Sequence, residues 1–203
     1  MNQFQIHQPK SYQEVPWRNG RGKTLLLLSE PLPGSGDFAW RLSIAGVDSD
    51  GPFSRFDDCD RTLVLLEGRG MTLTHGDGRA DVLHERFALA RFPGDVGTVA
   101  TLHDGPIRDF NVMCQRHHCT AAVKVLGDGN VLHVDDDLLL AYAVDGTVRL
   151  SAPSGPPLRI EHRELLQYFC SSPGRWLISG GPVIAVRIRG RRAGPGLRPA
   201  QKS

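Results

Sequence analysis

The feature that most constrains the fold is a nearly continuous apolar run, Thr62–Glu67, which ends at Gly68. A strand that is covered on both faces has this pattern, because every side chain, and not every second one, then meets apolar neighbours. A polar loop, 53–61, precedes the run, and Gly68 supplies a residue suited to the turn that ends it. The sequence therefore predicts at least one central strand in a sheet that is buried on both sides.

Period-two alternation extends over much of the rest of the chain. In 38–45 large apolar residues alternate with small or polar ones, as in a strand with one apolar face. Met71–His75 and Ala80–Leu83 flank the turn Gly76–Gly78 and predict a hairpin. Helical periodicity is confined to a possible turn or two in 162–168. We therefore expect an all-β fold.

The second half repeats this order of strands and turns about 78 positions later. Leu63–Gly68 is echoed by Ala141–Gly146, and the turn Gly76–Gly78 is echoed by Ser154–Pro156. A single offset over this length favours a duplicated β-barrel, with two unrelated meanders of similar hairpin spacing as the alternative. The polar residues do not repeat, and a ligand needs polar groups to orient it. We expect one working pocket, in the first copy.

Composition excludes several classes of protein. The chain has 203 residues with 40% apolar content, and its net charge of +2 is too small to indicate nucleic acid or membrane as a partner. The first ten residues lack the apolar core of a signal peptide, and no run approaches the ~20 apolar residues that span a bilayer. We expect a cytoplasmic protein whose 4 cysteines stay reduced.

The stretch Phe53–Gly68 resembles the first motif of the cupins, a group of small jelly-roll barrels. Metal-binding cupins carry a His-x-His pair and a Glu there, whereas this chain has Ser, Arg, Phe and Arg at those places. The resemblance implies a barrel that has lost its metal, and we expect no metal and no other cofactor. Cys114–Cys119 has ligand types that suit zinc, but no second pair follows at finger spacing, which favours a strand end with a polar turn.

Longer motifs resemble one family. They are Trp17–Thr24, Trp40–Ala45, Gly51–Ser54, Asp60-Arg61, Phe92–Asp95 and Asp109–Met113 with Arg116. Together they are similar to the HutD/Ves family of bacterial bicupin-like proteins, over roughly residues 12 to 118. One departure is Asn19–Gly22, where the usual Asn-Gly-Gly-Gly reads Asn-Gly-Arg-Gly.

The resemblance implies an RmlC-like jelly-roll bicupin. Its units are expected at 1–118, with the ligand pocket, and at 119–190, as a scaffold, followed by a flexible tail at 191–203. It also implies an association with bacterial histidine utilisation, in which the family restrains pathway expression, through binding of an intermediate such as urocanate or N-formylglutamate. No enzymatic activity is established for the family, which favours a binding protein over an enzyme and leaves the question open at this point.

Strand parity and the motifs together select eight candidate ligand-binding residues. They are Arg41, Ser43, Phe53, Ser54, Phe56, Arg61, Asp109 and Asn111. A guanidinium binds a carboxylate through two parallel hydrogen bonds, so we expect a small carboxylate metabolite as the partner. Asn111 can donate and accept, the two phenylalanines supply apolar walls, and Asp109 orients an arginine.

Three alternatives remain open at this point. An internal Arg–Asp pair could tie two strands together without any ligand. An RmlC-like epimerase could use His103 beside Asp109 as its base, with an arginine stabilising an enolate. The chain could also be an interaction module, and a homodimer is possible.

Overall fold

The computed structural model describes residues 3–17, 23–135, 138–170 and 173–191. The turn Asn19–Gly22 and the tail, apart from Arg191, lie outside the described residues. Within that part, the one helix is the single 3₁₀ turn Pro9–Ser11, and none is long and apolar enough to cross a membrane. The all-β expectation is confirmed. The strands are β1 (Gln3–His7), β2 (Gln13–Pro16), β3 (Lys23–Pro31), β4 (Phe38–Val47), β5 (Gly51–Pro52), β6 (Cys59–Glu67), β7 (Met71–His75), β8 (Ala80–Leu83), β9 (Leu89–Pro93), β10 (Thr98–Leu102), β11 (Ile107–Gln115), β12 (Cys119–Leu126), β13 (Val131–Val134), β14 (Leu138–Ala143), β15 (Val148–Ser151), β16 (Leu158–Ile160), β17 (Leu165–Phe169), β18 (Gly174–Gly180) and β19 (Val183–Gly190).

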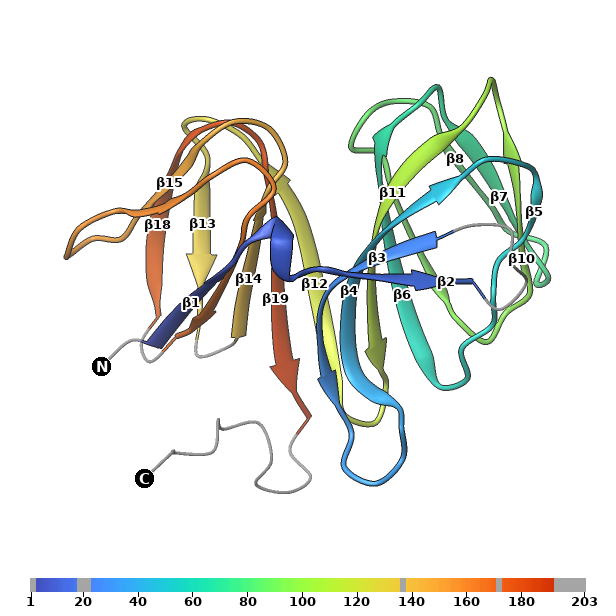
Figure 1. The fold of residues 1–203 in the computed structure, drawn as a ribbon, viewed down its shortest axis with the longest axis horizontal. Helices are drawn as coiled ribbons and strands as arrows, with labels where there is room; N and C mark the ends of the chain where they lie inside the picture. The colour runs from blue at the N-terminus through green and yellow to red at the C-terminus, as the bar shows by residue number, and fades with distance from the viewer. Residues whose placement is uncertain (1–2, 18–22, 136–137, 171–172, 192–203) are drawn as a thin grey trace.

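The first half is a sandwich of two antiparallel sheets. A six-stranded sheet with the order β2-β3-β4-β11-β6-β9 faces a four-stranded sheet with the order β5-β10-β7-β8 (Figure 1). Leu63 and Leu65 of β6 pack against Met71 and Leu73 of β7 in the core between them. This sandwich contains the candidate site described below.

The second half is built in the same way. Its sheets have the orders β1-β17-β14-β19-β12 and β13-β18-β15-β16, and its core includes Leu139, Leu150, Trp176 and Ile178. The strand β1 comes from the N-terminus but pairs with β17. Residues 3–7 therefore lie in the second half, although the sequence places them in a first unit of 1–118.

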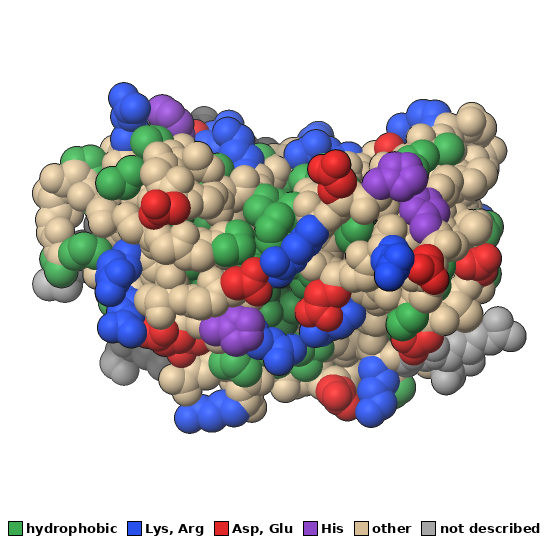
Figure 2. Space-filling view, turned by 90° about the horizontal axis from the view of Figure 1, so that it is seen from above, with side chains coloured by type: hydrophobic (Ala, Val, Ile, Leu, Met, Phe, Trp, Pro, Cys, Tyr) green, Lys and Arg blue, Asp and Glu red, His purple; other side chains and the backbone are tan. Residues whose placement is uncertain are grey.

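The two large sheets pack face to face at the centre of the molecule (Figure 1). Val64 and Leu66 point into this seam, whereas Leu63 and Leu65 point into the first sandwich. The prediction that β6 is buried on both faces is thus confirmed. Hydrophobic side chains are visible at the middle of the face shown in Figure 2, with acidic and basic side chains beside them.

Strand order corresponds between the halves. The series β4-β11-β6-β9 of the first has the same connectivity as β12-β19-β14-β17 of the second. Phe87 and Arg163, both at positive φ (71° and 66°), donate their backbone N–H to Leu65 and Ala143 respectively. Leu65 thus corresponds to Ala143, which lies 78 positions later, as the sequence predicts.

The offset is not constant, however. Asp109 lies opposite Leu65 and Val183 lies opposite Ala143, so the correspondence on β11 and β19 is 74 positions. A constant shift of 78 would instead align Asp109 with Arg187. The paired residues Leu65 and Asp109 are 44 positions apart, whereas Ala143 and Val183 are 40 apart, so the offset falls by four between the two strands.

Candidate functional site

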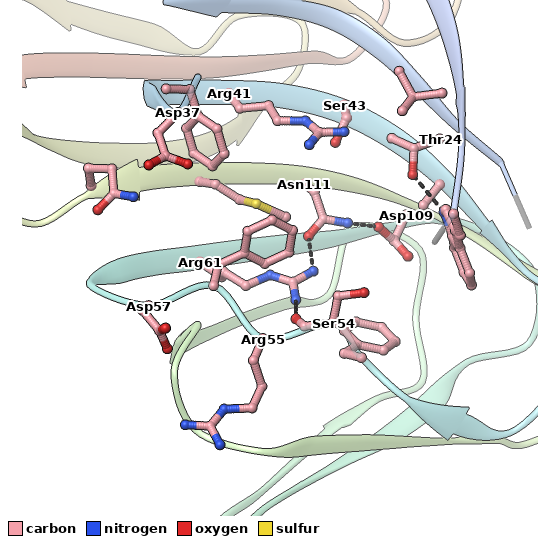
Figure 3. Close-up of a pocket in the computed structure, with 18 of the residues that line it drawn as sticks. Thr24, Asp37, Arg41, Ser43, Ser54, Arg55, Asp57, Arg61, Asp109 and Asn111 are labelled. Carbon is pink, nitrogen blue, oxygen red and sulfur yellow. Dashed lines mark hydrogen bonds between the residues drawn. The ribbon is translucent and has the colours of Figure 1, made fainter. Parts of the chain in front are cut away.

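A cavity of about 600 Å³ opens in the first sandwich. All eight residues selected from the sequence line it (Figure 3). They come from β4, β6 and β11 and from the loop 53–57, which lies over these strands. Their contribution to binding stays a prediction, but the structure brings them together in one place.

The floor of the cavity is formed by three sets of residues on one face of the sheet, two positions apart along the strands. We call each set a rung: its members lie directly opposite one another on β4, β11 and β6. The first rung is Arg41, Met113 and Arg61; the second is Ser43, Asn111 and Leu63; the third is Ala45, Asp109 and Leu65. Every second residue of a strand faces the same side, so the polar members all point into the cavity. The floor thus runs from two guanidiniums to one carboxyl group.

Arg61 is held rigidly at the first rung. Its side chain is almost fully buried, and its Nη2 donates to Asn111 Oδ1 at 2.7 Å while Nη1 donates to the Ser54 carbonyl oxygen at 3.3 Å. Its guanidinium carbon lies 5.1 to 5.7 Å from the ring centres of Phe53, Phe56 and Phe92. Burial lowers the pKa of Arg61 to about 10, so the group remains charged at neutral pH.

Asn111 bridges Arg61 and Asp109. Its Nδ2 donates to Asp109 Oδ1, while its own Oδ1 accepts from Arg61. Asp109 can therefore orient Arg61 only through Asn111, because Asp109 lies two rungs from Arg61 and Asn111 occupies the rung between them. Burial raises the pKa of Asp109 to about 7, and the positive charge of Arg61 only partly opposes this.

Arg41 supplies the second guanidinium, from the other side of β11. It is half-buried, and desolvation lowers the pKa of its guanidinium. Beside it on the same face of β4, Ser43 is almost fully buried. Two arginines thus approach one cavity from two strands that flank β11.

Unpaired polar atoms concentrate in this cavity. Four buried side-chain nitrogen or oxygen atoms of the described residues lack a hydrogen-bond partner, and three of them belong to cavity residues: Arg41 Nε, Arg61 Nε and Asp109 Oδ2. Buried polar groups in folded proteins are nearly always paired, and exceptions gather where a ligand or water is bound. The distribution makes this cavity the candidate binding site.

An ion-pair clamp fixes the loop that covers the cavity. Arg116 donates from Nη2 and Nη1 to the two carboxylate oxygens of Asp95 at 2.7 and 2.9 Å and from Nε to Asp60 at 2.7 Å. Hydrogen bonds to Arg116 hold the pKa of Asp95 down, at about 2. Gly94 donates to the Cys59 carbonyl at 2.6 Å and accepts from the Phe56 N–H at 2.9 Å. These motif residues position the loop 53–59.

Several lining residues were missed by sequence reasoning. Met113 has the parity of Asp109 and Asn111, so its strand pattern could have identified it. Trp17 lies in a quoted motif and donates from Nε1 to Thr24 Oγ1 at 2.8 Å. The exposed rim residues Asp37 and Asp57 sit in loops and carry no periodic signal.

Other chemistry suggested by the sequence lies elsewhere. His103 hydrogen-bonds Thr72 Oγ1 at 2.9 Å and stacks on His84, and it is not among the residues lining the cavity. Cys119 is buried with its Sγ 3.1 Å from the Ala39 carbonyl oxygen. Across the described residues, no group of three or more His, Cys, Asp or Glu is arranged to hold a metal ion.

The corresponding interior of the second half is filled by side chains. Leu139, Ala185 and Val183 occupy the places of Arg61, Asn111 and Asp109, and all three belong to its apolar core. No polar residue of this floor is thus repeated at the three positions.

Comparison with known proteins places the chain in a family. The HutD family model matches residues 9–168. An uncharacterised 21.2 kDa protein from the hutC 3′ region of Pseudomonas putida is 30% identical over 151 residues, which are 74% of this chain and 79% of that protein. The protein Ves of Citrobacter koseri is 38% identical over 110 residues, 54% of this chain and 56% of its own length.

Solved structures agree. HutD from Pseudomonas fluorescens SBW25 superimposes with a TM-score of 0.81 at 25% identity, covering 93% of this chain and 100% of that one. A cupin 2 conserved barrel domain protein from Leptotrichia buccalis, 9% identical, has a TM-score of 0.53 over 83% of this chain and 88% of its own, which shows a cupin-like fold. With a family model that spans most of its length and a relative of this similarity, the chain belongs to the HutD family.

Proposed function

We propose that this chain is a metal-free, cupin-type binding protein for a small carboxylate metabolite and that it serves in the control of histidine utilisation. Support comes from a single observation above all. Arg41 and Arg61 share one rung of the cavity floor, and the Nε of each is buried without a hydrogen-bond partner in the part of the chain that the structure describes.

The physical chemistry of these two groups favours a carboxylate. Each charge-assisted hydrogen bond from a shielded guanidinium contributes ~1.5–3 kcal/mol. No acid shares the first rung with the two guanidiniums: Asp109 lies two rungs away and burial favours its protonated form, while the other two acids of the lining, Asp37 and Asp57, are exposed at the rim. An anion at the first rung would therefore meet two positive charges with donors to spare.

The link to histidine utilisation rests on the family. The Pseudomonas putida relative is described by its place in the hutC 3′ region, and the matching family model is HutD. Urocanate and N-formylglutamate, two intermediates of histidine breakdown, both carry carboxylates and are small enough for a cavity of about 600 Å³. They are the first ligands to test.

We also propose that the chain consists of two cupin-like units with a boundary near 118/119, of which the second is a scaffold. The boundary falls in the turn between β11 and β12. The matching strand orders of the two halves support a duplication, and the apolar residues Leu139, Ala185 and Val183 support a scaffold role.

The test is a thermal-shift and calorimetric titration of the protein with urocanate and N-formylglutamate, with histamine as a ligand that lacks a carboxylate. We expect one of the acids to raise Tm and histamine to leave it unchanged. Arg61→Ala and Arg41→Gln should each weaken binding at least about tenfold, since each removes charge-assisted bonds. Arg175→Ala, an exposed arginine on β18, is the matched control.

Two outcomes would contradict the proposal. If binding survives unchanged in both cavity variants, the arginines are structural and do not hold the ligand. If neither urocanate nor N-formylglutamate binds, the proposed ligands are wrong. Chromatography of the titrated samples distinguishes a sensor, which returns its ligand intact, from an enzyme, which consumes it.

A further inference from the structure

Asp109 is a buried carboxyl group on the floor of the cavity, two rungs from the guanidiniums. Its side chain is fully buried, and its Oδ1 accepts a hydrogen bond from Asn111 Nδ2, while its Oδ2 has no hydrogen-bond partner among the described residues. Its neighbours on the third rung, Ala45 and Leu65, are apolar. A carboxylate loses the hydration of its charge in such a place, and one amide N–H replaces little of it. The surroundings therefore favour the neutral carboxyl group.

Few charged groups of the cavity lie close to Asp109. The cations of the floor are Arg61 on β6 and Arg41 on β4, and both lie on the first rung. The other ionisable groups of the lining are exposed and lie at the opposite end of the cavity from Asp109 (Figure 3): Asp37, Arg55 and Asp57. No cation among the described residues thus makes direct contact with this carboxyl group.

Ionisable groups elsewhere on the surrounding strands are paired outside the cavity lining. They include Arg108 with Glu67, Lys23 with Glu14, Asp60 with Arg116, and, on the facing sheet, His75 with Asp81. Arg61 is therefore the main charge that acts on Asp109. Burial raises the pKa of Asp109 to about 7, and the positive charge of Arg61 opposes this only in part.

A carboxylate bound at the first rung would change the environment of Asp109 in two ways. Its negative charge offsets the positive charge of Arg61, which otherwise favours the ionised form of Asp109. Its atoms also displace water from the cavity floor, which weakens the solvation of any charge there. Both effects have the same sign, because each makes ionised Asp109 less favourable. Binding of an anion therefore strengthens the binding of a proton by Asp109.

We propose that Asp109 is a proton-binding site linked to the carboxylate site, so that the protein takes up as much as one proton from the solvent when it binds its anionic ligand near neutral pH. This inference rests on the proposed function, because it assumes that Arg41 and Arg61 hold a carboxylate. Linkage is reciprocal, so a proton on Asp109 strengthens binding of the anion by the same factor. The site then responds to pH as well as to the concentration of its ligand.

The protonation of the ligand-free protein sets the sign and the range of the pH dependence. Below about pH 6 Asp109 already carries its proton, since its pKa is about 7, and binding then takes up almost none. Above that pKa the ligand-free protein has lost the proton, and binding restores it. Affinity should therefore be constant at low pH and fall between about pH 6 and about pH 8.5. The fall is about tenfold for each unit by which the ligand raises the pKa of Asp109.

The test counts protons by calorimetry. N-formylglutamate is titrated into the protein at each pH in two amine buffers, which differ in ionisation enthalpy and offer no anion to the arginines. The difference between the two measured heats gives the number of protons taken up per ligand. The carboxyl groups of N-formylglutamate stay ionised throughout this range, so the ligand supplies no proton of its own. We expect about half a proton or more per ligand at about pH 7.5 and almost none at about pH 5.5.

Asp109→Asn is the decisive variant, because an amide imitates the neutral carboxyl group and keeps an oxygen that can accept from Asn111. Proton uptake should vanish, and the affinity should stay at its low-pH level. At about pH 8.5 the variant should therefore bind the ligand about fivefold or more tightly than the wild type. A purely structural role of Asp109 would change the affinity without removing the proton uptake. Asp104→Asn, an exposed aspartate that pairs with Arg69 outside the cavity, should keep the wild-type uptake.

The outcomes separate this inference from the proposed function. Clear binding without proton uptake at about pH 7.5, or uptake that persists in Asp109→Asn, overturns the linkage and leaves carboxylate binding intact. The count in the wild-type protein decides the matter even if the variant does not fold. Should urocanate bind in place of N-formylglutamate, the count is made at about pH 8, where an imidazole is already neutral. If neither acid binds, the proposed ligands are wrong, and this inference fails together with the proposed function.

Discussion

Arg41 and Arg61 stand on opposite sides of Met113, each directly across from it on a neighbouring strand, so that two guanidiniums reach the same cavity. They are 20 positions apart in the chain, on β4 and β6, and only the insertion of β11 between these strands gives them a common target. Asn111 and Asp109 follow on the same face of β11. The two guanidiniums, the amide and the carboxyl group therefore form one polar row along the floor of the cavity.

Asn111→Leu should destabilise the protein by about 2–4 kcal/mol, because it leaves the Nη2 of Arg61 and the Oδ1 of Asp109 buried without their partner. Urea unfolding measures the change. The double variant Asn111→Leu/Asp109→Leu should recover part of the loss, since it removes the stranded carboxyl group. As a control, Asn130→Ala removes an amide oxygen from an exposed turn and should cost less than about 1 kcal/mol. Equal effects of the two amide substitutions would show that the bridge is unimportant.

Asp109 should make the protein less stable as the pH rises from about 4 to about 7. Its folded-state pKa is about 7, which is above the ordinary value, so the folded protein binds more protons than the unfolded chain within this window. The penalty is therefore absent below the window and complete above it, with an upper limit of about 4 kcal/mol. Asp109→Asn should flatten this part of the profile and should be more stable than the wild type at pH 8. Stability curves of the two proteins that run parallel from pH 4 to 8 would refute the assignment.

Arg116→Ala should loosen the loop that covers the cavity. The substitution removes the hydrogen bonds to Asp95 and Asp60, and hydrogen exchange in 53–59 should rise while the core of β6 stays protected. Ligand affinity should fall severalfold, since binding must then order the loop. Arg108→Ala is the control, because Arg108 of β11 pairs with Glu67 of β6 and neither residue lines the cavity. Unchanged exchange in 53–59 would contradict the clamp.

Gly94→Ala should destabilise the same loop by about 1–3 kcal/mol. A Cβ at this position would lie 2.9 Å from the Phe56 carbonyl oxygen and 3.0 Å from that of Cys59, and both contacts are with backbone, which cannot rotate away. Gly97→Ala, three residues later, meets nothing within 4 Å and provides a matched control. Thermal unfolding of the two variants should differ by several degrees, and similar Tm values would show that the loop yields easily.

Much of the local structure could be predicted because strand patterns are local. Thr62–Glu67 reads as a doubly buried strand, and Leu63 and Val64 indeed face different cores. The parity of Arg61, Asp109 and Asn111 was also readable, since side chains alternate along any strand. The family resemblance of the quoted motifs also indicated that loop 53–56 belongs to the candidate site.

The register in which the strands pair was harder to predict from the sequence than the strands themselves. The sequence suggests a constant offset of 78, but Asp109 corresponds to Val183 at an offset of 74, because 44 positions separate Leu65 from its partner Asp109 and only 40 separate Ala143 from Val183. Nothing in the sequence indicated that β1 pairs with β17 of the second half, since a short edge strand can pair with any open edge. The same limit explains why the sequence did not reveal that Asn111 lies between Asp109 and Arg61.

The sequence by itself determined that the chain forms short strands, which faces of those strands are apolar, and which polar residues interrupt the apolar faces, since these properties depend on neighbours one or two positions away. Only the tertiary structure decided that β11 lies between β4 and β6, which places Arg41, Arg61, Asn111 and Asp109 in one cavity. It also decided that burial would raise the pKa of Asp109 and leave its Oδ2 without a hydrogen-bond partner among the described residues. The physical reason is that hydrogen bonding across strands and exclusion of water depend on segments that are distant in the chain.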